Sequence, residues 1–251
     1  MMWLVHLVTD RYEREARAIP ALLVVLPLLV PLMCIFGAKN AVLNGLVVLL
    51  AACGAIYAIA SIARGLGKRL EETLVQRWGG MPTTIALRHR DGFLDSISKD
   101  RYHNLIAAKL KVRMPTAEQE RDDPEGCDQI YLGAVRELRE RTRGSKGLLL
   151  KENIAYGFHR NMLAMKPVGI TICLLAIAAG CVLAGALRPT EPHVVLGALM
   201  DMGLAPALTL AISFALLAAW IFYFNEGAVR RIGFVYAERL FECLPTIKAK
   251  R

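Results

Sequence analysis

Two short segments of the 251-residue chain combine side chains that could bind an anionic or polar ligand. The first, RWGGMPTTIALRHRD at residues 77–91, joins two glycines and a proline to a basic cluster. Glycine permits close backbone approach and proline suits the first turn of a helix, so backbone N–H groups there could hold a phosphate. The alternative is a rigid turn, because the segment lacks a recognised phosphate-loop pattern. The predicted ligand-binding residues in this segment are Arg77, Trp78, Gly79, Gly80, Thr83, Thr84, Arg88 and Arg90.

The second segment, KENIAYGFHRN, carries polar side chains at helical spacing. Glu152, Tyr156 and Arg160 recur every four residues and would share one face of a helix. Asn153 and Asn161 would lie in the adjacent row. A polar stripe two rows wide predicts a vestibule for a ligand or an ion. The alternative is a satisfied polar contact with neighbouring helices.

Other patterns argue against catalysis and metal binding. Residues 120–128 (ERDDPEGCD) hold five acids, but their spacing does not match a calcium loop, and Pro124 is typical of a helix start. We therefore expect a solvated acidic loop. The five histidines are scattered, and neither HExxH nor GxSxG occurs in the sequence. The sequence therefore predicts no catalytic residue, no metal and no cofactor. An enzyme would need Glu152, His159 or Asp201 as its acid or base.

Most of the helices predicted around these two segments are long and apolar. The chain is 55% hydrophobic, with a mean hydropathy of +0.40. The excess is concentrated in four uncharged windows at residues 18–38, 40–63, 167–187 and 202–225. Each window has the length of about 20 residues that a membrane-spanning helix needs. We therefore predict an all-α integral membrane protein with four transmembrane helices in two hairpins and a helical cytoplasmic domain between them.

The basic residues predict the orientation. They are numerous before the first window, in the long middle segment and after the last window, whereas the two short hairpin loops contain only Lys39 and Arg188. The positive-inside rule then places both termini and the middle segment in the cytoplasm. The net charge of +9 suits anionic lipid headgroups and requires no nucleic acid. The predicted segments are 1–17 (interfacial), 18–63 (first hairpin), 64–166 (cytoplasmic domain), 167–225 (second hairpin) and 226–251 (basic tail).

The middle segment is predicted to form short helices. Residues 100–110 and 128–143 have helical patterns, and Thr116 begins a capping-box pattern. Another helix, at 148–165, would lead into the third span at Pro167.

Glycine, proline and alanine positions add expectations about the helices. Gly157, in the middle of a predicted helix, costs about 1 kcal/mol relative to alanine, which suggests a close neighbour. Pro27 and Pro31 are expected to kink the first span. Small residues recur every four positions in three of the predicted spans, which favours a compact bundle or a homo-oligomer. The six cysteines contain no CxxC pair and are expected to be free thiols.

Several motifs together resemble a family of uncharacterised bacterial four-span membrane proteins. They are RWGGMPTTIALRHRD, RMPTAEQERDDPEGCDQIY, LRERTR and LLLKENIAYGFHRNMLAMKPVGI, and the resemblance covers roughly residues 76–170. It implies the inner membrane of a bacterium as the location, and it implies no activity, ligand or catalytic residue. The general plan is also similar to that of four-helix membrane effectors of bacterial anti-phage systems, which are thought to perturb the inner membrane when triggered. This second similarity is one of architecture alone.

These observations support three hypotheses about function. The first is a non-enzymatic effector whose cytoplasmic domain senses an anionic small molecule or a protein partner and whose spans then oligomerise or leak. The second is a membrane-anchored scaffold or assembly factor with a stoichiometric partner. The third is a membrane enzyme that acts on a lipid or a nucleotide. The lipid bilayer is an expected partner in all three.

Overall fold

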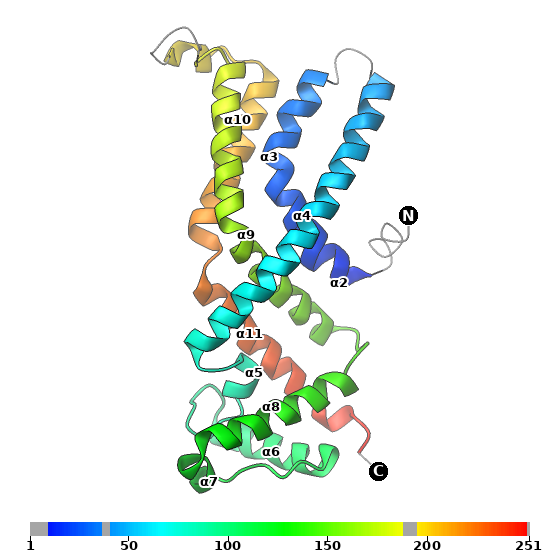
Figure 1. The fold of residues 1–251 in the computed structure, drawn as a ribbon, viewed down its shortest axis with the longest axis vertical. Coiled ribbons are helices and arrows are strands. Elements are labelled where there is room, and N and C mark those ends of the chain that lie inside the picture. Colours follow the sequence, from blue (N-terminus) through cyan, green and yellow to red (C-terminus); the bar gives the residue numbers. More distant parts are fainter. Residues whose placement is uncertain (1–9, 37–40, 188–194, 250–251) are drawn as a thin grey trace. The chain divides into compact units, whose positions relative to one another are not determined.

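The computed structural model describes residues 10–36, 41–187 and 195–249, and their side chains except those of residues 33–57 and 196. This part of the chain consists of helices and connecting segments, and no strand occurs within it (Figure 1). The prediction of an all-α protein is therefore confirmed.

Three of the described helical segments are long and apolar enough to cross a membrane. The first runs from Arg11 to Leu32 and combines α2 (Arg11–Glu13), the π-helix η1 (Arg14–Ala18) and most of α3 (Ile19–Phe36). The second is α9 (Leu148–Leu183). The third runs from Leu204 to Tyr223, through α10 (Leu204–Ala218) and the π-helix η3 (Ala219–Tyr223).

The predicted span at residues 40–63 falls on α4 (Ala41–Trp78), which is continuous over 38 residues. The side chains of α4 up to residue 57 lie outside the described part, so the prediction of a fourth span remains a prediction. The outer loop at 188–194 is likewise outside it, and a short 3-10 helix, η2 (Leu196–Leu199), follows that loop.

Prolines do not interrupt the apolar helices. Pro27 and Pro31 both lie inside α3, and Pro167 lies inside α9 rather than at the start of a separate helix. The helix predicted at 148–165 and the span predicted to begin at Pro167 therefore form one continuous helix. Each proline removes one backbone donor, and nearby side chains can bond to the groups it frees. In α9 the hydroxyl of Thr171 donates to the carbonyl of Pro167 at 3.0 Å.

The chain divides into two compact units. Unit 1 comprises Met1–Leu70 and Gly157–Asn225, and within it α10 contacts α3. Its buried core includes Val24, Met162 and Trp220.

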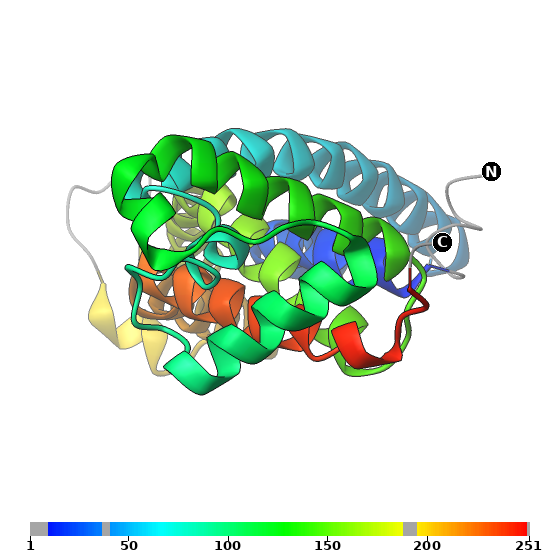
Figure 2. The same ribbon diagram turned by 90° about the horizontal axis from the view of Figure 1, so that it is seen from below.

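Unit 2 comprises Glu71–Tyr156 and Glu226–Arg251, so the C-terminal residues fold with the middle segment. Its helices are α5 (Pro82–Ile85), α6 (Ser96–Leu110), α7 (Ala117–Asp122), α8 (Pro124–Arg141), α11 (Glu226–Phe241) and the 3-10 helix η4 (Leu244–Thr246). Helix α8 contacts α5, α6 and α7, and it lies above α6 in Figure 1 and toward the viewer, as α6 does, in the view from below (Figure 2).

Side chains set the boundaries of the helices in unit 2. The predicted capping box is present at α7, where the Thr116 hydroxyl and the Gln119 side chain each accept a hydrogen bond from the other residue's backbone N–H. Asp95 caps α6, and Asp123 caps α8 in front of Pro124. The predicted helix start at Pro124 is thus confirmed.

Candidate functional site

The first predicted segment begins where α4 ends, and it turns the chain sharply. Trp78 is the last residue of α4, and Gly79 and Gly80 follow with φ angles of 73° and 151°. Glycine adopts such positive φ angles without the strain that a side chain would cause. The N–H of Gly80 donates to the carbonyl of Val75 at 2.9 Å, which satisfies one of the last carbonyls of the helix. Pro82 then occupies the first turn of α5, as predicted.

The guanidinium of Arg88 fills the space beside this turn. It donates two hydrogen bonds to the carboxylate of Asp128, at 2.7 and 2.8 Å, and one to the carbonyl of Gly79 at 2.5 Å. A Cβ placed on Gly80 would lie 2.7 Å from Nη2 of Arg88. Arg88 is 8% exposed, so its charge is neutralised inside the protein. This arrangement favours the rigid-turn alternative over a phosphate cradle.

The other predicted residues of this segment also contact protein groups. The indole N–H of Trp78 donates to Glu226 at 2.9 Å, and Arg77 donates to the same carboxylate at 3.1 Å. These two bonds tie the end of α4 to the first residue of α11. Thr83 and Thr84 are both buried, and the Thr84 hydroxyl has no hydrogen-bond partner within the described ranges.

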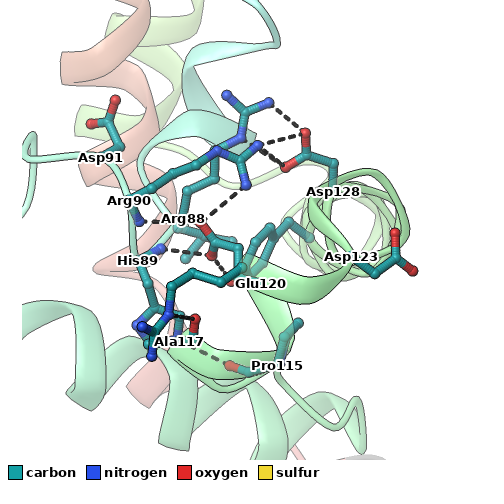
Figure 3. A network of polar contacts seen from close by, with 12 residues as sticks. Arg88, His89, Arg90, Asp91, Pro115, Ala117, Glu120, Asp123 and Asp128 are labelled. Atoms are coloured by element: carbon teal, nitrogen blue, oxygen red, sulfur yellow. Dashed lines mark hydrogen bonds and ion pairs between the residues drawn. The ribbon is translucent and has the colours of Figure 1, made fainter.

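A carboxylate on α7 is the centre of a buried polar network (Figure 3). Glu120 accepts hydrogen bonds from the backbone N–H groups of His89 and Arg90, at 2.8 and 3.1 Å. It also accepts from the Arg90 guanidinium at 3.0 Å and from the Tyr131 hydroxyl at 2.5 Å. Arg90 donates further to Asp128 at 3.0 and 3.1 Å. The network joins α7 and α8 to the segment that follows α5.

The prediction of a loop at residues 120–128 is therefore wrong, and the predicted exposure to solvent holds for Asp122, Asp123 and Glu125 but not for Glu120. These residues belong to α7 and α8, and Glu120 is only 2% exposed. Burial alone would raise the pKa of Glu120. The hydrogen bonds from Tyr131 and the two backbone N–H groups, together with the positive charge of Arg90, outweigh burial and lower this pKa.

The irregular segment at residues 87–91 is held by charged and polar side chains from α6. The buried Lys99 donates to the carbonyl of Asp91 at 2.6 Å, and the buried His103 ring bonds to the carbonyl of Leu87 at 2.8 Å. Burial lowers the pKa of His103, and its hydrogen bond to Leu87 offsets only part of this effect. Backbone groups without a helical partner are thus satisfied by side chains.

In unit 2, the second predicted segment packs against α11. The Tyr156 hydroxyl donates to Glu71 at 2.8 Å, and its ring is stacked with Tyr236 at a centroid distance of 6.4 Å. A Cβ on Gly233 would lie 2.8 Å from Pro82 and 3.2 Å from the Tyr156 ring. Tyr156 and the start of α5 therefore meet at the same glycine. This contact was one of the two alternatives that the sequence left open.

In unit 1, the same helix α9 continues with a buried asparagine. Asn161 is 1% exposed, and its side-chain N–H donates to the carbonyl of Ala16 in η1 at 2.8 Å. Arg160 donates to the amide oxygen of Asn161 at 3.4 Å. Gly67 of α4 lies so close to this oxygen that a Cβ there would overlap with it. Asn161 thus joins three helical segments of unit 1.

The close neighbour expected at Gly157 is also present. A Cβ at this position would lie 2.7 Å from the Tyr12 hydroxyl and 3.2 Å from Cβ of Ala16. Only a glycine lets the N-terminal segment approach α9 this closely.

The predicted residues do not share one environment. Glu152 and Asn153 are half-buried in unit 2, whereas Arg160 and Asn161 belong to unit 1. Three residues that organise the network were not predicted as site residues: Glu120, Tyr131 and Lys99. The sequence does contain a signal for the contacts of Glu120 and Asp128, because an acidic segment and the basic RHR triplet could pair with each other. The acidic segment was instead predicted to face solvent, and the basic triplet to bind a ligand.

Comparisons with protein families, curated proteins and solved structures gave no match. Within the part of the chain that the structure describes, no group of three metal-ligating side chains is close enough to hold a metal ion. The candidate site is therefore described by its own contacts: the network of paired charges around Glu120 in unit 2, and the buried side-chain amide of Asn161 in unit 1.

Proposed function

We propose that this chain is a non-enzymatic, multi-pass protein of the bacterial inner membrane. In this proposal its helical unit 2 lies in the cytoplasm and responds to a ligand or a protein partner. The apolar helices of unit 1 then change their packing and perturb the bilayer.

The observation that carries this proposal is the continuity of two helices. Helix α4 runs for 38 residues and α9 for 36, and each contributes residues to both units. A displacement of the unit 2 part of such a helix is transmitted along its axis, because the backbone hydrogen bonds keep the helix stiff. Coupling between distant sites commonly amounts to about 1–3 kcal/mol, which is enough to shift a two-state equilibrium.

The outward-facing residues of unit 1 support a role in the bilayer. Large apolar side chains are exposed on α9 and α10, among them Leu174, Leu175 and Phe214. In a membrane these side chains would face lipid or a second copy. At Gly180 the two helices come so close that a Cβ would lie 2.8 Å from Leu210, and small residues at such contacts are typical of membrane bundles.

The second candidate function is a membrane-anchored scaffold. It is favoured by one observation: the arginine and tryptophan side chains predicted to bind a ligand at residues 77–91 bond to the protein itself. Arg88 is neutralised by Asp128, and Arg77 and Trp78 bond to Glu226. A protein built this way would present a rigid surface to a partner without changing its own packing.

Membrane potential in bacteria that express the chain tests the proposal. We expect wild-type cells to depolarise, and cells with Asn161→Ala to depolarise less at equal membrane levels, since this change removes the bond to Ala16. Asn104→Ala is the matched control, because Asn104 is exposed on α6, and it should behave as wild type. Retained potential in all three strains, together with a stoichiometric co-purifying partner, would favour the scaffold instead.

A further inference from the structure

We propose that α8 joins copies of this chain head to tail. A groove beside the N-terminal half of α8 in one copy receives the opposite face of α8 from a second copy. This inference is independent of whether the chain perturbs the membrane or acts as a scaffold.

The groove has an apolar floor and a mainly acidic rim. Its volume is about 550 Å³, and it lies between the segment before α7 and the first turns of α8. Met114, Pro115 and Ile130 supply apolar surface. Asp122 and Asp123 supply two exposed carboxylates to the rim, and Arg113 supplies one exposed cation.

The opposite face of α8 carries the complementary pattern. Leu132 is 37% exposed, and Arg136 and Arg139 follow it at spacings of four and three residues, so the three side chains share one face. Glu140 is exposed next to them. Among the described residues, no hydrogen bond or ion pair engages the side chains of Arg136 and Arg139. The face thus offers one apolar side chain, two cations and one anion to a groove with an apolar floor, two anions and one cation.

The positions of the two faces require a head-to-tail arrangement. At 100° per residue, the groove-lining residues of α8 and the basic face lie roughly 160° apart around the helix axis. The basic face cannot pair with itself, because like charges would meet. A contact between two different surfaces repeats from copy to copy and gives a ring or a row. The charges set the register, and burial of Leu132 against the groove floor supplies affinity.

Charge reversal in the full-length chain tests this contact. We expect Asp122→Arg and Arg136→Glu each to reduce association of copies in native-like lipid discs by at least about threefold, because each replaces an attraction with a repulsion. The double variant Asp122→Arg/Arg136→Glu restores complementary charges and should restore association. Two exposed residues outside both surfaces provide the matched controls, Asp100→Arg and Arg231→Glu.

A photocrosslinking residue at position 132 provides a second measurement, made with two copies of different mass. The proposal predicts a crosslink from one copy to the groove segment of the other. A monomeric wild-type chain, a double variant that fails to recover, or a crosslink to other segments would overturn it. If the copies do not associate but still depolarise the membrane, this contact is rejected and the membrane proposal stands. If the copies assemble through this contact without depolarising the membrane, the membrane proposal is rejected and this contact stands.

Discussion

At the scale of single residues, Glu120 is the group on which the polar network of unit 2 depends. Replacement by glutamine removes the charge that faces Arg90 and leaves the buried Tyr131 hydroxyl and one backbone N–H without a good acceptor. We expect Glu120→Gln to lower the free energy of unfolding by about 2 kcal/mol, or roughly 4–8 °C in melting temperature. Thermal unfolding of the detergent-solubilised protein, followed by circular dichroism, measures this change. Glu118→Gln, at an exposed position on the same helix, should change little, and equal effects of the two substitutions would contradict the role of Glu120.

The buried histidine predicts how stability depends on pH. Because burial lowers the pKa of His103 below its ordinary value of 6.5, the unfolded chain binds a proton before the folded protein does. Stability is therefore full above pH 6.5 and declines as the pH falls through that value. Glu120, whose pKa is lowered from 4.5, contributes stability above that pH and loses it only in stronger acid.

His103→Gln separates these two effects. A glutamine can still donate to the carbonyl of Leu87 but does not titrate, so the melting temperature of the variant should stay level between pH 7.5 and 5. The wild-type melting temperature should fall over the same interval. Parallel curves for the two proteins would show that His103 does not control this decline.

Only some residues of the candidate site could be predicted from the sequence. The basic cluster and the polar stripe were recognisable because their members lie within a few residues of one another. The partners of Arg88 and Arg90 were not, because Asp128 is 40 and 38 residues away in the chain. Spacing along a sequence shows which side chains share a face, but it does not show which opposite charges meet across helices.

At the scale of elements, helix ends were predictable from the sequence, whereas the effect of Pro167 on its helix was not. The capping box at Thr116 and the helix start at Pro124 depend on local hydrogen bonds, which the sequence displays directly. Pro167 was expected at the junction between the helix at 148–165 and the third span, and α9 passes through it without a break. Whether a helix tolerates a proline depends on what surrounds the freed backbone groups, and that is decided by tertiary packing.

Two glycines of α4 provide a matched test of close packing. Gly67 faces the amide of Asn161, whereas a Cβ at Gly65 would meet nothing within 4 Å. Gly67→Ala should therefore displace Asn161, break its bond to Ala16 and lower the melting temperature. Gly65→Ala should leave it unchanged or raise the stability by up to about 1 kcal/mol, through reduced freedom of the unfolded chain. A stable Gly67→Ala protein would mean that α4 and α9 can separate without cost.

At the scale of the whole molecule, the number of spans determines where the two ends of the chain lie. Four spans place both ends on the cytoplasmic side, whereas the three candidate helices in the described residues would place them on opposite sides. We expect a fluorescent protein fused to either end to fluoresce, and alkaline phosphatase fused after Lys39 or after Arg188 to be active in the periplasm. A fluorescent fusion at one end only would rule out the fourth span.

Composition was enough to predict helices long and apolar enough to cross a membrane, but not the division into two units. An apolar window is visible in the sequence regardless of what it packs against. The assignment of α11 to unit 2 depends on contacts between residues that are far apart in the chain, such as the bonds of Arg77 and Trp78 to Glu226.

The two thiols of unit 2 have a consequence for labelling chemistry. Burial raises the pKa of both Cys127 and Cys243, and neighbouring carboxylates raise each of them further. Maleimides react with the thiolate, so both native cysteines should react slowly at neutral pH. Ile97, in the first turn of α6, is 80% exposed. A cysteine introduced there would carry a fluorophore selectively within this unit, with both of its native cysteines left in place.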